Sequence, residues 1–490
     1  MRDFPLIFAS RRRVFCVFTL FWSLGLAIAG DDWLHAGFLY DQFPTTLAEG
    51  HRTEAVGPFY YSQETTDESI VAVPPLFSHY HYPGVKNGEF DFLYPLLTYE
   101  YYEDEWRWQF FQVIAFAGGR QPDENHTRRF TLFPIYFQQR SADTNLNYTA
   151  VVPFYGDIKN RLFYDELRFV MFPIYLQTRR KDVVTDNYLF PIVHVRNGDG
   201  LHGWQVFPFA ARERKVMTMQ TNSWGDLVTY GGHDLSFIMF PFWISQNNNL
   251  NTENPEKFRA SIPAFVYTRS PARDSTWVFW PFFGWMKDHK NNYHEWDGPW
   301  PFVIFARPDG DPTPATKTTS RVWPIFSQSH NASIEQDSYL WPIYRYKWVH
   351  SPPLDRRSTR IVFYLYVGID EKNTETGNVK KRRDMWPFFT WRKDFNGNTR
   401  FQIIAPIESV LAENRGIQRN WSPIWSLWRS QYNPGTQSDY QSLLWNLYRR
   451  QTTPDSKNIS LLFGLFQYQR EGKDSRTRLF FVPVYHSHQK

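Results

Sequence analysis

Residues 129–143, RFTLFPIYFQQRSAD, decide the fold of this chain. They place Pro134 in the middle of an apolar run that otherwise has the composition of a β-strand, although proline has no N–H to donate to a neighbouring strand. The same arrangement returns as FVMFPIYLQTRRKD from Phe169 and as YLWPIYRYKWVH from Tyr339. A proline-centred strand is therefore a repeated unit of the chain.

The unit recurs along almost the whole sequence, and most neighbouring prolines of the series lie about 17 to 23 residues apart. The series consists of Pro58, Pro75, Pro95, Pro134, Pro153, Pro173, Pro191, Pro208, Pro241, Pro263, Pro281, Pro301, Pro324, Pro342, Pro387, Pro406, Pro423 and Pro483. In the longer gaps, similar segments without the proline begin at Trp106, Trp224, Ile361, Leu443 and Leu461. Together these segments give roughly two dozen units.

Each unit joins an aromatic or aliphatic stretch to a polar connection, such as RNGDGLHG from Arg196 or RKDFNGNTR from Arg392. In residues 344–348, YRYKW, aromatic and cationic residues alternate, which places them on opposite faces of a strand. This period of two and the aromatic enrichment predict strands. The only helix predicted is a short patch, ESVLAENRG, from Glu408.

The repeats predict an all-β fold, a large antiparallel up-and-down meander of roughly 20–24 proline-centred strands. We expect the sheet to close as a barrel, because closure removes exposed edge strands. A proline at the same level of every strand would mark a common bulge and fix the register. A β-solenoid or another soluble β-repeat fold is the alternative, because a period near twenty also suits one coil of a solenoid.

The N-terminus has the order of a secretory signal peptide: arginines at 11–13, an apolar stretch, and Ala27-Ile28-Ala29 before Gly30. We therefore predict a signal peptide over residues 1–29, a lead-in segment over 30–54 and a single β-repeat domain over 55–490. An uncleaved anchor helix is the alternative. The only cysteine, Cys16, lies in the predicted signal, so no disulfide or thiolate chemistry is expected in the exported part.

Composition narrows the classes of partner. The formal net charge is only +5 over 490 residues, which gives no support to a nucleic-acid partner. After Gly30 no stretch of about 18 apolar residues occurs, so no further membrane-spanning helix is expected. Aromatic residues nevertheless make up 19% of the chain.

An exported chain with strands of about ten residues, many aromatic residues and no apolar helix resembles bacterial outer-membrane β-barrel proteins. The resemblance covers nearly all of the exported chain at the level of this class. It implies an outer-membrane protein, either a porin-like channel or a structural envelope protein, with the lipid bilayer and the outer-membrane assembly machinery as partners. One departure is the C-terminus, where the last strand is followed by HSHQK (486–490) instead of ending on an aromatic residue.

In such a channel, Arg345 and Lys347 are candidates for lumen or rim positions, where they would act on small solutes. The alternative function is a secreted or periplasmic all-β repeat protein that binds polysaccharide, or another envelope component, through exposed aromatic residues. The glycan would then stack on these rings.

No catalytic signature is present in the sequence, and no catalytic residue, cofactor or metal is predicted. Two H-x-H pairs, His79/His81 and His486/His488, would each place two imidazoles on one strand face, but we interpret them as exposed histidines at strand ends. We interpret the carboxylates around Glu100, beside Arg107, as a charged strand end. A secreted enzyme on the same scaffold is the least favoured alternative.

Overall fold

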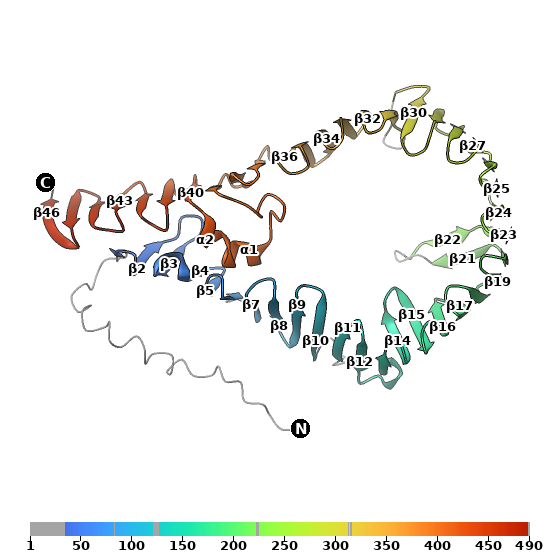
Figure 1. The fold of residues 1–490 in the computed structure, drawn as a ribbon, viewed down its shortest axis with the longest axis horizontal. Coiled ribbons are helices and arrows are strands. Elements are labelled where there is room, and N and C mark those ends of the chain that lie inside the picture. Colours follow the sequence, from blue (N-terminus) through green and yellow to red (C-terminus); the bar gives the residue numbers. More distant parts are fainter. Residues whose placement is uncertain are drawn as a thin grey trace.

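The computed structural model describes residues 35–82, 84–120, 127–221, 225–311, 313 and 316–488. In these residues, 44 strands form one sheet, in which each strand pairs antiparallel with its neighbours in the sequence. The sheet curls into a wide ring one layer thick, and its two ends lie against each other (Figure 1). The predicted all-β antiparallel meander is confirmed. The predicted signal peptide lies outside the described residues.

The first part of the sheet runs from the N-terminal end to the far side of the ring (Figure 1). Its strands are β1 (His35–Ala36), β2 (Tyr40–Pro44), β3 (Gly50–Ala55), β4 (Tyr60–Thr65), β5 (Ser69–Val73), β6 (Phe77–Tyr82), β7 (Asn87–Phe92), β8 (Leu97–Tyr102), β9 (Glu105–Phe110), β10 (Ile114–Arg120), β11 (Arg128–Phe133), β12 (Tyr136–Arg140), β13 (Tyr148–Val151), β14 (Tyr155–Arg161), β15 (Tyr164–Val170), β16 (Tyr175–Arg180), β17 (Val183–Tyr188), β18 (Val193–Gly198), β19 (Leu201–Val206) and β20 (Ala210–Lys215).

The second part returns to the starting point. Its strands are β23 (Gly232–Ile238), β24 (Trp243–Leu250), β25 (Glu256–Ser261), β26 (Phe265–Arg269), β27 (Arg273–Val278), β28 (Phe283–Asp288), β29 (Tyr293–Asp297), β30 (Val303–Pro308), β31 (Thr318–Val322), β32 (Phe326–His330), β33 (Ile334–Tyr339), β34 (Tyr344–Ser351), β35 (Leu354–Ile361), β36 (Tyr366–Asn373), β37 (Val379–Met385), β38 (Phe389–Lys393), β39 (Thr399–Ile403), β40 (Trp428–Asn433), β41 (Ser438–Leu443), β42 (Tyr448–Thr452), β43 (Ser456–Leu461), β44 (Phe466–Glu471), β45 (Asp474–Leu479) and β46 (Val482–His488).

Few elements lie outside this sheet. The hairpin of β21 (Thr218–Thr221) and β22 (Leu227–Tyr230) projects into the ring (Figure 1). Two short helices, α1 (Arg415–Asn420) and α2 (Ser422–Trp425), lie where the two ends of the sheet meet. The helical patch predicted from Glu408 is wrong over most of its length, because residues 408–413 form turns and α1 begins only at Arg415. Single 3-10 turns occur at Gly57–Phe59 and Thr144–Leu146.

Most of the repeated prolines lie in turns between strands, so the prediction that they lie at strand centres and in bulges is wrong for these positions. Pro483 is an exception, because it lies within β46, beside a register shift in the pairing with β45. Between β15 and β16, for example, the chain turns over Met171-Phe172-Pro173-Ile174, and the N–H of Ile174 donates to the carbonyl of Met171 at 2.8 Å. Many of these aromatic–proline peptide bonds are cis. Each unit therefore supplies two strands of about six residues, which explains why the strand number is about double the predicted 20–24.

Hydrogen bonds and ring contacts connect one proline turn to the next. The N–H of Phe172 donates to the carbonyl of Pro153 at 2.7 Å, and the N–H of Phe190 donates to that of Pro173 at the same distance. The Phe172 and Phe190 rings lie 5.8 Å apart between centroids. Similar ring contacts join Phe207 to Phe240, Trp323 to Trp341 and Trp341 to Phe363. The aromatic–proline pair recurs because the ring packs against the next ring, while the proline carbonyl accepts from the next turn.

The two ends of the sheet overlap face to face, and we call the contact of β2–β7 with α1, α2 and β38–β44 the overlap (Figure 1). Phe43 stacks on Tyr440 with 5.5 Å between ring centroids. The fully buried Arg449 forms an ion pair with Asp41 across the overlap. Among the described residues no pairing joins β1 to β46, so closure into a barrel by strand pairing is not confirmed.

The overlap identifies the inner face of the ring, because the faces in contact there are those turned toward the interior. Asp91 and Arg449 belong to this face. Residues that are paired across neighbouring strands lie on the same face of a sheet, so the strand register identifies the inner-face residues of every strand between these two. A buried apolar cluster lies on the inner face of β12–β16: Phe137, Tyr148, Ala150, Ile158, Phe169 and Leu176. The opposite side of the sheet is the outer face.

Candidate functional site

Exposed apolar side chains follow one rim of the ring, at the turns that contain the prolines. Every second connection of a meander lies at the same edge of the sheet, so these turns form a continuous row, which we call the proline rim. The residue after the proline is half exposed or more at Ile174 (54%), Phe209 (58%) and Phe242 (59%). Other exposed apolar residues of the rim are Ile135, Phe154, Leu189, Ile192, Met239, Phe282, Ile325, Leu340, Ile343, Phe388 and Leu462.

The apolar surface continues from the proline rim onto the outer face. The outer-face row next to the turns is formed by the first and last residues of successive strands, which pair with one another. In β15–β24 this row consists of Val170, Tyr175, Tyr188, Val193, Val206, Ala210, Ile238 and Trp243. At the opposite rim most loops are polar, as at Thr144–Leu146 and at residues 374–378, although Phe163 is exposed there in the turn between β14 and β15. The wall is therefore amphipathic along its height.

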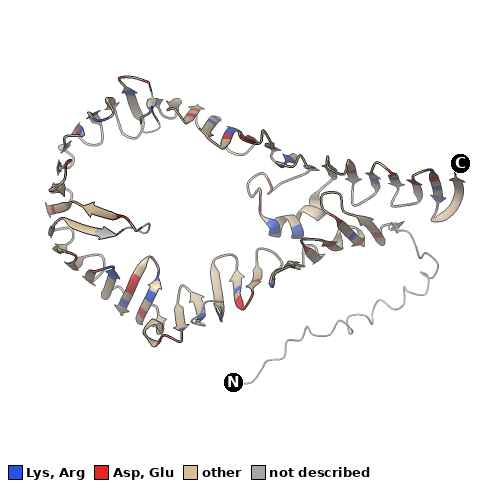
Figure 2. Cartoon of the chain, turned by 180° about the vertical axis from the view of Figure 1, so that it is seen from behind, with Lys and Arg blue, Asp and Glu red and all other residues tan. Residues whose placement is uncertain are grey.

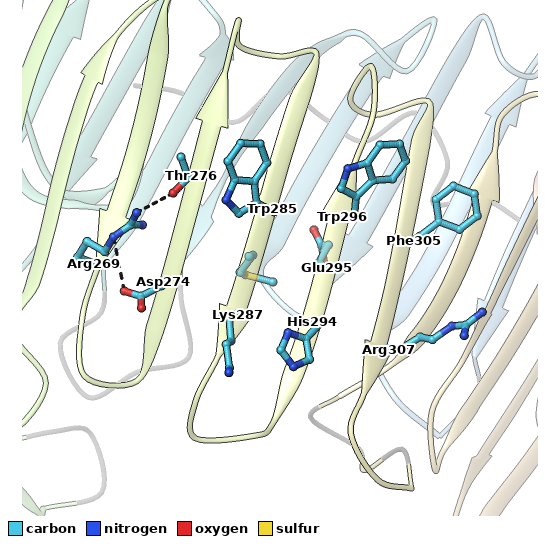
Figure 3. Close-up of a pocket in the computed structure, with 11 residues that line it drawn as sticks. Arg269, Asp274, Thr276, Trp285, Lys287, His294, Glu295, Trp296, Phe305 and Arg307 are labelled. Atoms are coloured by element: carbon cyan, nitrogen blue, oxygen red, sulfur yellow. Dashed lines mark hydrogen bonds and ion pairs between the residues drawn. The ribbon is translucent and has the colours of Figure 1, made fainter.

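A shallow groove of about 700 Å³ lies on the outer face of β26–β30 (Figure 3). Trp285 and Trp296 are cross-strand partners and are 48% and 46% exposed. The next row toward the polar rim is charged and includes Lys287 and Arg307. This groove offers flat aromatic surface beside cations, and it faces away from the ring interior.

The overlap contains several deeply buried polar groups, including Glu54, Asp91, Asn420 and Arg449. Glu54 is 2% exposed and accepts hydrogen bonds from Arg52 Nε at 2.8 Å and from Asn446 Nδ2 at 2.6 Å. Burial alone raises the pKa of Glu54, but Arg52 and Arg429 outweigh it and hold the pKa below its ordinary value. The overlap is thus built on charges that are compensated across the two ends of the sheet.

The structure also places the residues that the sequence singled out. The two candidates for lumen positions, Arg345 and Lys347, both lie on the inner face of β34. Glu100 forms an ion pair with Arg107 on the next strand at 2.9 Å. His81 Nδ1 lies 3.1 Å from the Tyr101 hydroxyl. Within the described residues no group of three or more His, Cys, Asp or Glu side chains is placed to hold a metal ion.

Several arginines that the sequence did not single out converge at the overlap: Arg52, Arg392, Arg400, Arg415, Arg419 and Arg429. Four of the six lie in residues 392–419, and that local concentration of arginine was the only signal available in the sequence. Their meeting with Arg52 depends on contact between the two ends of the chain, which no local pattern reveals.

Neither helix of the described part of the chain has the length and apolar content needed to cross a membrane. Comparison with protein-family models and with curated proteins found no match to this chain.

Proposed function

We propose that the protein is a structural protein of the cell envelope. It inserts its proline rim into one leaflet of a membrane, and the rest of the sheet stands on that membrane surface as a curved wall. The observation that carries the proposal is the continuous row of exposed apolar side chains at one rim, opposite loops that are mostly polar at the other. Transfer of a fully exposed side chain of this kind from water into lipid contributes roughly 1.5–3 kcal/mol, and a half-exposed one contributes about half of that. Repeated at many turns, this contribution supports stable membrane attachment.

Strand length favours the structural role over a porin-like channel. Strands such as β16 and β19 have six residues, which extend about 20 Å. A transmembrane strand needs about 9–11 residues to cross the hydrocarbon core. Rim insertion requires only that the turns and the adjoining outer-face row enter the lipid, which six-residue strands permit.

A closed barrel, the arrangement predicted from the sequence, would require β1 to pair with β46. The role proposed here does not depend on that pairing, because the overlap already joins the two ends through buried contacts. We place the protein at the outer membrane, following the predicted signal peptide and the resemblance to outer-membrane proteins.

Vesicle flotation tests the proposal. The full chain is mixed with vesicles of phosphatidylethanolamine and phosphatidylglycerol and centrifuged through a density gradient. We expect the unaltered protein to float with the vesicles and the triple variant Ile174→Asp, Phe209→Asp, Phe242→Asp to lose at least about tenfold in vesicle affinity. These side chains are exposed, so the substitutions leave the packed interior unchanged.

A matched control adds the same three negative charges at the opposite rim, as Ala142→Asp, Asn145→Asp and Thr374→Asp. All three positions are exposed in polar loops. We expect this control to float like the unaltered protein. Equal loss in both triple variants would mean that charge repulsion and not rim insertion governs attachment, and the proposal would fail.

A second candidate function is glycan binding at the outer-face groove, because Trp285 and Trp296 lie side by side with exposed rings. Aromatic rings of this kind stack on sugar faces. Quenching of tryptophan fluorescence by an envelope polysaccharide, lost in Trp285→Ala and retained in the rim triple variant, would support this function. Absence of quenching by every polysaccharide of the host envelope would remove it.

A further inference from the structure

A basic cavity of about 470 Å³ lies in the overlap, between β3–β6 on one side and β38–β40 with the two helices on the other. The six converging arginines line it, and the blue segments of the helices in Figure 2 mark basic residues at this place. The cavity is independent of the proline rim, because its lining comes from inner-face and helix residues.

Three of the six arginines have carboxylate partners. Arg419 Nη2 donates to Asp91 Oδ2 at 2.9 Å and also pairs with Glu89. Arg52 and Arg429 share Glu54, at 2.8 and 3.7 Å. These partners hold the three side chains in place and compensate their charge.

The other three, Arg392, Arg400 and Arg415, have no carboxylate within 4.0 Å among the residues that the structure describes. Arg392 donates to main-chain carbonyls, including that of Glu408 at 3.3 Å. Arg415 lies 6.0 Å from the centre of the Tyr80 ring. Arg400 and Arg415 are exposed within the cavity and can be reached from solvent.

The two carboxylates that line the cavity are already engaged elsewhere. Glu408 accepts hydrogen bonds from Ser422 Oγ at 2.5 Å and Trp425 Nε1 at 2.8 Å. Glu68 accepts from Gln63 Nε2 at 2.9 Å.

Unused hydrogen-bond donors add to this imbalance. Arg52 Nη2 and Arg419 Nε are buried in the same cavity wall without hydrogen-bond partners. A buried charged donor without a hydrogen-bond partner lowers the stability of the folded protein. A bound anion would accept hydrogen bonds from such donors. The cavity therefore combines the exposed guanidinium groups of Arg400 and Arg415 with more arginines than carboxylates among its lining residues.

We propose that this cavity binds a phosphomonoester carried by a small polyol such as a sugar. A phosphomonoester has close to two negative charges and three acceptor oxygens at neutral pH, which suits the planar donor forks of Arg400 and Arg415 beside the charge of Arg392. Amides and hydroxyls complete the lining and match sugar hydroxyls: Gln63, Gln402, Gln418, Gln431, Thr65 and Thr390. The volume lies within the range of small-molecule sites.

Titration calorimetry of the full chain with glucose 6-phosphate tests this site. We expect saturable binding that Arg400→Gln and Arg415→Gln each weaken about tenfold, because neither substitution strands a buried carboxylate. Arg180→Gln is the matched control, since Arg180 is exposed outside the cavity and forms no ion pair in the described structure. We expect this control to bind like the unaltered protein, and we expect no binding of glucose.

The same phosphomonoester can come from a free sugar phosphate or from a lipid headgroup. Tighter attachment to vesicles with phosphatidylinositol 4-phosphate than to vesicles with phosphatidylinositol, reversed by Arg400→Gln, would assign the headgroup. No binding of either probe, or an equal loss in Arg180→Gln, would overturn the proposal. The rim triple variant is expected to retain glucose 6-phosphate binding, so failure of this site and failure of rim insertion are distinguishable.

Discussion

Two arginines on the same inner face show how the overlap differs from the rest of the wall. Arg449 lies in the overlap, where it is fully buried and paired with Asp41. Arg345 lies on the inner face of the single-layered wall and is exposed. Some inner-face positions of the wall are thus open to solvent, whereas at the overlap the opposite end of the sheet covers the inner face. The predictions below compare the overlap and the wall in their packing, their buried charges and their stability.

The largest effect is expected from breaking the overlap charge pair. Arg449→Met leaves Asp41 buried without its cation, which costs about 3–5 kcal/mol. We expect faster hydrogen exchange throughout β2–β3 and β41–β43, with the far side of the ring unchanged. The double variant Arg449→Met, Asp41→Leu should recover much of the loss, because both charges are then removed.

Arg345→Met is the control on the wall. It removes an exposed inner-face arginine, and it should alter hydrogen exchange very little. If both single variants have the same effect, the overlap does not hold the ends together in the way described.

A buried acid of the wall offers the next comparison, because Asp297 lacks the cation that Asp41 has. Asp297 is 1% exposed, and burial, followed by the charge of Glu295, raises its pKa to about 7. Since the folded pKa lies above the unfolded value, the contribution of Asp297 to stability is full below about pH 4 and falls by about 1.4 kcal/mol per pH unit as the pH rises toward 7. In urea unfolding at pH 4 to 8, the difference in stability between the unaltered protein and Asp297→Asn should change with this slope. A difference that does not change with pH would exclude this contribution of Asp297.

A glycine tests how tightly the wall itself is packed. A Cβ at Gly156 would lie 2.4 Å from the Phe169 ring and 2.6 Å from Ala150 Cβ. We expect Gly156→Ala to destabilise the protein by about 1–3 kcal/mol, because the ring has to move. Gly310→Ala, where the added Cβ meets nothing within 4 Å, should be close to neutral. Equal melting temperatures for the two variants would show that the inner-face cluster is loose.

The smallest effect is expected from the ring ladder along the proline rim. Trp341 contacts Trp323 and Phe363, with ring centroids 5.4 and 5.6 Å apart. Each such pair contributes about 0.5–1.5 kcal/mol beyond its burial. Trp341→Leu should therefore lower stability modestly and increase protease cleavage at the neighbouring turns. If cleavage is unchanged, the ladder does not order the rim.

The sequence predicted the repeat, the strands and the meander, but not the position of the prolines. Residues with positive φ in turns are usually Gly, Asn or Asp, whereas here Met171 and Leu189 adopt positive φ at the starts of the proline turns. Hydrogen bonds from the adjacent turn stabilise that conformation, and they are visible only in the assembled sheet. The overlap escaped prediction for a related reason, because Asp41 and Arg449 are about 400 residues apart.

One labelling experiment tests the central claim that the proline rim enters lipid. In a chain with Cys16→Ser, which has no other cysteine, a single cysteine is introduced as Ile174→Cys or as Thr374→Cys and labelled with an environment-sensitive fluorophore. On addition of vesicles, we predict a blue shift and quenching by lipid-borne quenchers at position 174 and no change at position 374. An unchanged spectrum at 174, or equal shifts at both positions, would contradict the account.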